Sequence, residues 1–545
     1  MQSNFPNDNN EQYSPTAIIL PPESQKSGCG FSGCLIGCGI VCLVLIITSI
    51  IAGLLIHSYC FKSIPLKVSP ETTLVTTPLK SDGKSVDFYT VLKKQIEPQN
   101  PTSNNGFKNV LAAYGKELFI NNSQEALNYD WIFNEICKAV ELDPNFTPEN
   151  VYKEPNLSVF LNGLNENNAE KESSIKELKL TIFDELLTKN WSIQNYPEIE
   201  EWLNKVNPGL DVVQKAAMEE SYFIPMIRRN EQELALVSLS PPIINANAKL
   251  IHGLQIRSIL QIGERNFDKA WDDILASFHL QRKLINKGIH LFNYNIPTEI
   301  KLQIIKTIAQ SSSNWTPEQL NKAINDLQSI PQAPKREDLL LTAQYTVLDA
   351  FAMTNNTEQF VESIASLSFA ARTQLDSLIN IMKLFGFNWN IAAKKMNEAV
   401  TIYKKTINDE KNTEKLLNPA TIDAQLDIQK FSQKLSIDLH NKMINVITVS
   451  GRSEVAGYII GEIVPFTEKY IFKQTLNDEI YYRLLQTAFA IELYKSEHKK
   501  YPDSIDQLKL NPPRITAIKT NYKLTDKGYK ISISGVELEF ITNTD

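Results

Sequence analysis

The histidines are the first residues to consider for acid–base chemistry or metal binding. A zinc-protease helix places two histidines four residues apart with a glutamate between them. No two histidines in this chain have that spacing: they are His57, His252, His279, His290, His440 and His498. His279 and His290 flank the end of one expected helix and could meet, but we interpret them as solvated or core histidines.

Ser-x-x-Lys is a pattern in which a lysine activates a serine nucleophile. Ser173–Lys176 and Ser496–Lys499 are among the segments that match it. The Lys-Thr-Gly motif that accompanies it in that enzyme class is absent, as are the Gly-x-Ser-x-Gly elbow and the Walker loop, and no Gly-x-Gly-x-x-Gly run follows an expected strand as in a Rossmann fingerprint. A chain rich in Ser and Lys produces such short matches by chance, so neither segment predicts an enzyme.

Clustered carboxylates and large aromatic side chains are further candidates for a functional site. Paired carboxylates can perform general acid–base catalysis, but on amphipathic helices they usually form solvated faces. Tryptophans at helical spacing usually belong to the core. The residues concerned are Glu198, Glu200, Glu201, Asp272, Asp273, Trp202, Trp271 and Trp315. The sequence therefore predicts no catalytic, cofactor-binding or metal-binding residue and no cofactor.

The charge and the cysteine content exclude further classes of protein and of site. The formal net charge is −7 over 545 residues, with Lys and Glu interleaved, which lacks the concentrated basic face of a nucleic-acid-binding protein. Only Cys137 lies beyond residue 60, so an intrachain disulfide or a multi-cysteine zinc site is excluded from that part. The other five cysteines are Cys29, Cys34, Cys38, Cys42 and Cys60.

One long uncharged stretch near the amino terminus is the strongest signal in the sequence. No residue from Ser27 to Phe61 carries a formal charge, and the run from about Leu35 to Ile56 is long enough to cross a hydrocarbon core as a helix. A polar tail precedes the run and no cleavage site closes it, so a spanning helix is favoured over a signal peptide. Gly33 and Gly37 fit a helix-dimer face, but such pairs are common in spans.

The side of the membrane on which the body lies is not set clearly by charge. Lys26 precedes the span, whereas Lys62 and Lys67 follow it, so the positive-inside rule weakly favours a cytoplasmic body. The scarcity of cysteine after residue 60 is more typical of an exported bacterial protein. We predict a single-pass protein of the cell membrane whose body lies outside the cytoplasmic membrane.

The composition divides the chain into five parts. We expect a disordered polar tail over residues 1–27, a transmembrane segment over 28–61 and an extended linker rich in Pro, Thr and Ser over 62–87. An α-helical body over 88–465 and a module of one long helix and a small sheet over 466–545 complete the plan. The predicted fold class is mainly α.

Two local patterns in the body fix helix ends. Thr316, Pro317 and Gln319 predict a capping box, so a helix should begin at Thr316 and stop before Pro331. A pair of helical patterns predicts an αα-hairpin that turns at Gly263–Phe267. This hairpin is similar to tetratricopeptide pairs, but no fixed period repeats it, so an irregular helical body is favoured over a repeat array.

The carboxy-terminal part changes from a helical to an alternating pattern. From about Gln474 a helix carries an apolar stripe: Ile480, Leu484, Leu485, Ala488, Phe489 and Ile491. Beyond a short capped turn at Asp503–Leu508, a two-residue loop at Ser534-Gly535 would pair Ile531 with Leu538 and Lys530 with Glu539. Another strand through Tyr522 and Leu524 completes a three-stranded antiparallel meander, which the long helix should cover.

This carboxy-terminal part resembles a known family. The segment AFAIELYKSEHKKYPDSIDQL, with a later strand start at Gly528-Tyr529, looks like the end of the long helix, the Tyr-Pro turn and the small sheet of type II secretion major pseudopilins. Most of the chain is also similar to uncharacterised bacterial single-pass membrane-anchored helical proteins. The pilin cleavage motif is not matched, because Gly30-Phe31-Ser32 is followed by Gly33, Cys34 and Leu35 with no Glu. We therefore do not expect a pilin subunit.

Two functions from different classes remain. The favoured one is a noncatalytic envelope scaffold that is attached to the membrane by one helix and binds a protein partner or itself, without nucleic acid. The alternative is an envelope hydrolase whose active site is assembled from distant helices that no local motif reveals. Convergent His, Asp or Glu side chains in a deep pocket would favour the enzyme, and an exposed apolar patch would favour the scaffold.

Overall fold

A computed structural model gives the fold of the chain. It describes residues 46–54, 57, 63–97, 104–119, 129–146, 152, 197–228, 241–285, 298–352, 387–408, 430, 433–434, 437–438, 448–508, 510, 518, 520–526, 528–533 and 536–541. The chain divides into two units, Met1–Tyr59 and Cys60–Asp545.

The described part of the first unit is a helix over residues 46–54. Its large apolar side chains are not covered by protein: Ile46, Ile50 and Leu54 are 56%, 56% and 65% exposed. Residues 1–45, 55 and 56, which include most of the predicted span and its Gly33 and Gly37, lie outside the described residues. Among the helices that are described, none combines the length and the apolar character needed to cross a bilayer.

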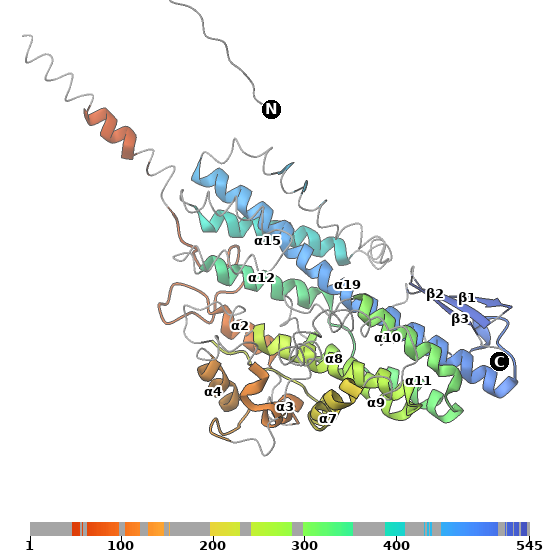
Figure 1. Cartoon of the computed structure of the whole chain (residues 1–545). Coiled ribbons are helices and arrows are strands. Elements are labelled where there is room, and N and C mark those ends of the chain that lie inside the picture. The colour runs from red at the N-terminus through yellow and green to blue at the C-terminus, as the bar shows by residue number, and fades with distance from the viewer. Residues whose placement is uncertain are drawn as a thin grey trace, which may run out of the picture. The chain divides into compact units, whose positions relative to one another are not determined.

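The second unit is mainly helical and ends in a small antiparallel sheet (Figure 1). Its described α-helices range from 9 to 50 residues, unlike a repeat of fixed length. The elements are α2 (Phe88–Ile96), α3 (Gly106–Tyr114), η1 (Gly115–Phe119), α4 (Tyr129–Ala139), α7 (Pro197–Met218), α8 (Pro241–Gly263), α9 (Phe267–Ile285), α10 (Thr298–Ser311), η5 (Ser312–Asn314), α11 (Pro317–Ser329), α12 (Arg336–Ala352), α15 (Trp389–Asn408), α19 (Val449–His498), η8 (Ile505–Gln507), β1 (Thr520–Thr525), β2 (Gly528–Ile533) and β3 (Val536–Ile541).

Helix α19 is much longer than the sequence pattern predicts. It begins after Thr448, whose hydroxyl caps the first turn, and ends at Lys499 in the left-handed conformation. The expected boundary between residues 465 and 466 therefore falls inside a continuous helix. Pro465, which would be expected to mark a break, lies within it. Tertiary packing on all sides of α19 overrides the local breaker.

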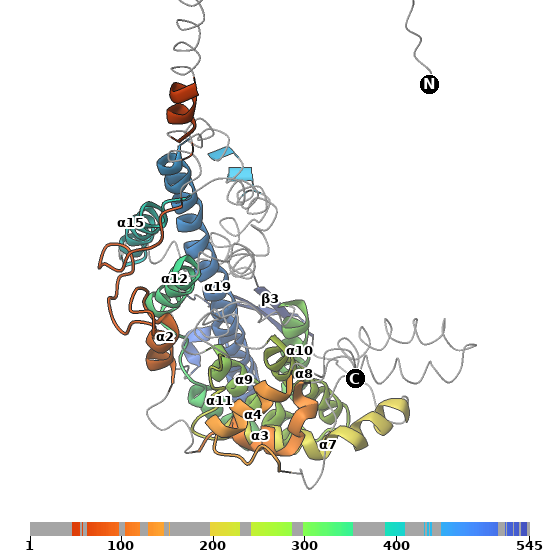
Figure 2. The same cartoon turned by 90° about the vertical axis from the view of Figure 1, so that its left-hand side faces the viewer.

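Two glycines let α15 approach the first part of α19 closely (Figure 2). A Cβ atom on Gly457 would lie 2.3 Å from the carbonyl oxygen of Ala392, and one on Gly461 would lie 2.7 Å from the Cβ of Ala399. Both distances are far below van der Waals contact, so larger side chains would force the two helices apart. The Gly-x-x-x-Gly spacing on α19 thus serves a buried contact between two helices of the body.

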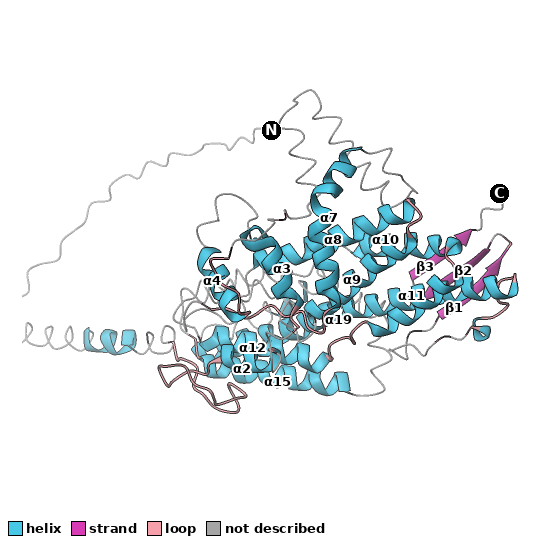
Figure 3. Ribbon diagram, turned by 90° about the horizontal axis from the view of Figure 1, so that it is seen from below, coloured by secondary structure: helices cyan, strands magenta, loops and turns pink. Residues whose placement is uncertain are grey.

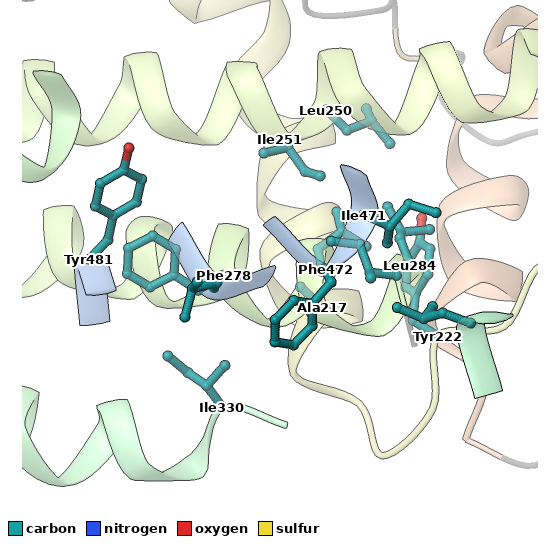
Figure 4. Packing of buried hydrophobic residues seen from close by; sticks show 14 of the residues in the cluster. Ala217, Tyr222, Leu250, Ile251, Phe278, Leu284, Ile330, Ile471, Phe472 and Tyr481 are labelled. Atoms are coloured by element: carbon teal, nitrogen blue, oxygen red, sulfur yellow. The ribbon is translucent and has the colours of Figure 1, made fainter. Parts of the chain in front are cut away.

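The second part of α19 packs against α9, α10 and α11. Phe489 stacks on Trp315 at 5.1 Å between ring centroids and meets the edge of Trp271 at 5.4 Å. Figure 4 shows Phe278 of α9 beside Tyr481 of α19, with Ile471 and Phe472 along the same core. The buried apolar residues of the second unit form one cluster that contains both the helical body and the sheet.

The local helix signals are confirmed. Thr316 and Gln319 form the reciprocal capping box at the start of α11, with Pro317 as its first residue. The αα-hairpin is also present, as α8 ends at Gly263 and α9 begins at Phe267. Both patterns depend on residues within a few positions of each other, which is why the sequence alone specifies them.

The sheet has the predicted register. In the β2–β3 pair Ile531 lies opposite Leu538 and Lys530 lies opposite Glu539, and in the β1–β2 pair Tyr522 lies opposite Ile531. Figure 3 shows the three strands near the carboxy-terminal end of α19. Tyr529 and Ile533 of β2 are fully buried, and β2 contacts α19, so the long helix covers the sheet as expected.

The predicted linker is not a free tether. Residues 63–86, which we call the strap, turn at residues 70–74 and 81–85 instead of forming one extended run, and they lie against α12 and α15 of the body. Ile64 pairs in parallel with Asn388: its amide donates to the carbonyl of Phe387, and its carbonyl accepts from the amide of Trp389. These backbone hydrogen bonds, together with the packing of Leu66, Val68, Leu74 and Val75 against the core, fix the strap to the body, which the composition did not reveal.

Side chains on α15 and α12 fasten the strap along its length. The Asn397 amide donates to the carbonyls of Glu71 and Thr72 at 2.9 and 3.1 Å, and its oxygen accepts from Gln344. Further along, Lys80 forms a buried ion pair with Asp349 at 3.6 Å. The chain is therefore held before it enters α2.

The strap should be released by removing its buried amide clamp. We expect Asn397→Ala to leave the two strap carbonyls without their donor and to increase cleavage between residues 63 and 80 several-fold under limited proteolysis. The matched control is Lys394→Ala on the same helix, which removes only an exposed ion pair with Glu71. Equal cleavage of the two variants would show that Asn397 does not hold the strap.

Candidate functional site

Only part of the chemically suggestive motifs lies within the described residues. His279 is buried and its Nε2 lies 3.1 Å from the Ser329 hydroxyl, whereas His290 lies outside the described residues. Ser173–Lys176 also lies outside them. The Ser496 hydroxyl donates to the carbonyl of Leu493, and Lys499 ends α19. Neither residue of that pair acts on the other.

The carboxylate runs include both solvated and buried groups. Glu201 pairs with Lys205 and Asp272 pairs with Lys322, and the carboxylates of both pairs are at least half exposed. Asp273, the neighbour of Asp272, is instead almost fully buried. The side chain of Glu198 lies outside the described residues, and Glu200 is exposed.

Asp273 belongs to a structural ion pair between α8 and α9. It accepts two hydrogen bonds from Arg257, at 2.7 and 2.8 Å, and a third from Gln214 of α7. Arg257 also reaches Asp211, so these groups bind three helices together. Asp272 and Asp273 therefore do not form a catalytic pair.

The tryptophans are core residues, as predicted. Trp202, Trp271 and Trp315 are 1%, 2% and 7% exposed. The indole of Trp271 donates to Asp326, and that of Trp315 donates to Ser311. Their contacts are with other helices of the body, as expected for aromatic packing residues.

The strongest candidate site was not predicted from the sequence. Five buried polar side chains from three helices converge on the middle of α19, and we call them the α19 polar network. Each is at most 6% exposed. The members are Gln281 and Arg282 of α9, Lys301 of α10, and Asp478 and Glu479 of α19.

Each acidic member is paired with a cation from a different helix. Lys301 donates to Asp478 at 3.1 Å, and Gln281 donates to both oxygens of the same carboxylate at 3.1 and 3.2 Å. Arg282 donates through Nη2 to Glu479 at 2.9 Å. The two positive and two negative charges balance within the network, which is the condition for burying them.

Burial dominates the electrostatics of the network. It lowers the pKa of the Lys301 ammonium, and the carboxylate of Asp478 opposes this effect only in part. Burial also disfavours the charged form of Arg282, but the surrounding groups, which include Tyr482, Asp478 and Glu479, raise its pKa. Tyr482 adds a cation–π contact, with the guanidinium carbon 5.6 Å from its ring centroid.

A few polar atoms beside the network have no hydrogen-bond partner. Among the described residues these include Nε and Nη1 of Arg282 and Nε2 of His252, a residue of α8. Burial and the nearby charge of Lys301 lower the pKa of His252, which favours its neutral form.

A second buried cluster fixes the first part of α19. Arg336 of α12 donates to both oxygens of Glu468 at 2.6 and 3.0 Å and to the hydroxyl of Tyr403 of α15 at 2.8 Å. That hydroxyl donates to Glu468 in turn. Glu468 is fully buried, so this charge also depends on partners from other helices.

The comparisons with known proteins add no function. No family model, curated protein or solved structure matches the chain significantly. The likeness to pseudopilins therefore stays a prediction. Within the part of the chain that the structure describes, no group of three or more His, Cys, Asp or Glu side chains could hold a metal ion.

The α19 polar network was missed because its signal is not local. Asp478 and Glu479 lie directly before the apolar stripe of α19, where a two-sided helix would expose them to water. Their partners are almost two hundred positions away in the sequence. The available clue was that the charged pair directly precedes an apolar and aromatic run, Ile480 to Tyr482.

Neutralising one carboxylate tests whether the network is structural. We expect Asp478→Asn to leave Lys301 without its counter-charge and to lower the free energy of unfolding by about 3 kcal/mol. The exposed control Asp272→Asn should cost less than about 1 kcal/mol. Urea unfolding of the full chain in detergent, followed by circular dichroism, measures both. An equal loss of unfolding free energy in the two variants would show that burial does not determine how much the Asp478 charge contributes to stability.

Proposed function

We propose that the chain is a single-pass membrane protein whose helical body acts as a noncatalytic scaffold outside the cytoplasmic membrane. The body would bind a protein partner or a second copy of itself. Its only lipid-spanning element would be the apolar helix near the amino terminus.

The uncharged run from Ser27 to Phe61 carries this proposal. Its sequence supplies the roughly 20 apolar residues that a spanning helix needs. The helix over residues 46–54 supports the assignment, because Ile46, Ile50 and Leu54 are more than half exposed rather than packed on protein. Such a row of uncovered isoleucines and leucines favours burial in lipid.

The state of the buried charges supports a noncatalytic body. An acid or base needs to reach the substrate within hydrogen-bond distance. Asp478 and Glu479 are 3% and 5% exposed and already accept hydrogen bonds from Lys301, Gln281 and Arg282. A substrate would have to displace these partners, whereas a scaffold uses them to hold its helices together.

One observation favours the alternative, an envelope hydrolase. The α19 polar network brings acidic and basic groups from distant segments together, and Arg282 within it and His252 beside it have polar atoms without a hydrogen-bond partner. The paired variant Lys301→Met/Asp478→Leu distinguishes the two functions. A scaffold should keep its fold and its membrane attachment, because an apolar pair can replace a buried ion pair. A hydrolase would keep its fold and its membrane attachment but lose its activity.

Charges placed in the apolar helix test the anchor. We expect the double variant Ile46→Lys/Ile50→Lys to abolish flotation with phospholipid vesicles after an alkaline wash, because each lysine near a span centre costs about 3 kcal/mol. Both positions are exposed, so protein packing is not disturbed. The control Ile46→Leu/Ile50→Leu should float like the unchanged chain. Undiminished flotation of the lysine variant would refute the anchor.

A further inference from the structure

The strap fixes the place at which the chain leaves the body. Its first hydrogen bonds are made by Ser63, whose hydroxyl accepts from the amide of Phe387, and by Ile64. Asn390 then bonds the backbone at Pro65 and Lys67, at 2.9 and 2.6 Å. The body therefore begins at residue 63 and not, as the composition predicts, at residue 88.

The same place on the body holds the first turns of two helices. Trp389 is the first residue of α15 and bonds to Ile64. Ser453, in the first turns of α19, donates its hydroxyl to Val449, and this hydroxyl accepts from the amide of Asn388. The exit of the chain, the start of α15 and the start of α19 thus form one end of the body, which we call the α15 end.

The chain between the predicted span and the α15 end is short. Ser63 follows His57 by six positions, and six residues extend at most about 20 Å. A free linker up to residue 87 would instead have extended about 100 Å. Because the strap is bound to the body, most of the distance that a free linker could span is lost.

We propose that the α15 end is the membrane-facing surface of the body and that it lies against phospholipid headgroups. The inference rests on the proposed anchor. The exposed lysines Lys67, Lys394 and Lys395 belong to this end, and lysines near a lipid surface are attracted by anionic headgroups. Lys394 and Lys395 also pair with Glu71 and Glu398, and the exposed Glu454 of α19 interacts with Lys395, so the three lysines and three carboxylates of this end balance and the proposal rests on the short connection to the span.

Helix α19 makes the proposal measurable. It starts at the α15 end and runs for 50 residues, about 75 Å, toward the sheet. Ser450 is exposed at its start, and Lys500 is exposed just beyond its end. A probe at Ser450 should therefore lie near the bilayer, and a probe at Lys500 should lie far from it.

The experiment uses the full chain reconstituted in phosphatidylcholine vesicles that contain a headgroup-attached energy acceptor. Ser450→Cys and Lys500→Cys are labelled with a donor dye in a background without the five cysteines before residue 61. Cys137 is fully buried, and the unlabelled background measures any reaction there. We expect several-fold greater energy transfer from position 450 than from position 500.

A variant that releases the strap is the second part of the energy-transfer experiment. Asn390→Ala/Asn397→Ala removes the side chains that clamp the strap, so transfer from position 450 should fall toward that from position 500. Equal or reversed transfer from the two positions in chains that float with the vesicles would overturn the membrane-facing α15 end and leave the anchor intact. Chains that do not float would instead overturn the proposed anchor.

Discussion

Over most of its length α19 is enclosed by other helices and cannot turn its polar residues toward water, and this constraint shapes the body. Glu468, Asp478 and Glu479 of α19 are all at most 5% exposed. Each would be strongly destabilising without a partner, so each fixes a cation from another helix at hydrogen-bond distance. Together they set the positions of α9, α10 and α12 around α19.

Close packing adds a second constraint on the same helix. Gly457 and Gly461 leave room for the backbone of α15, and the rings of Trp271 and Trp315 enclose Phe489 near the other end. Apolar burial provides most of the stabilisation, whereas the ion pairs select which helices meet. The strap then closes over α12 and α15 and joins the chain's beginning to this core.

The sequence predicts those features that depend on neighbouring residues. The capping box at Thr316, the hairpin turn after Gly263 and the strand register around Ile531 all follow from short patterns. The extent of α19 and the docking of the strap do not, because they depend on partners hundreds of positions away. Pro465 and the polar composition of the strap are misleading locally, since tertiary contacts override both.

The central claim is that α19 is the core on which the rest of the second unit is assembled. Hydrogen exchange of the full chain, read by mass spectrometry, tests it most directly. The slowest amides should lie within residues 455–492 of α19, and they should exchange only on global unfolding. Faster exchange there than in α4 or α7, which contact α19 little, would contradict the account.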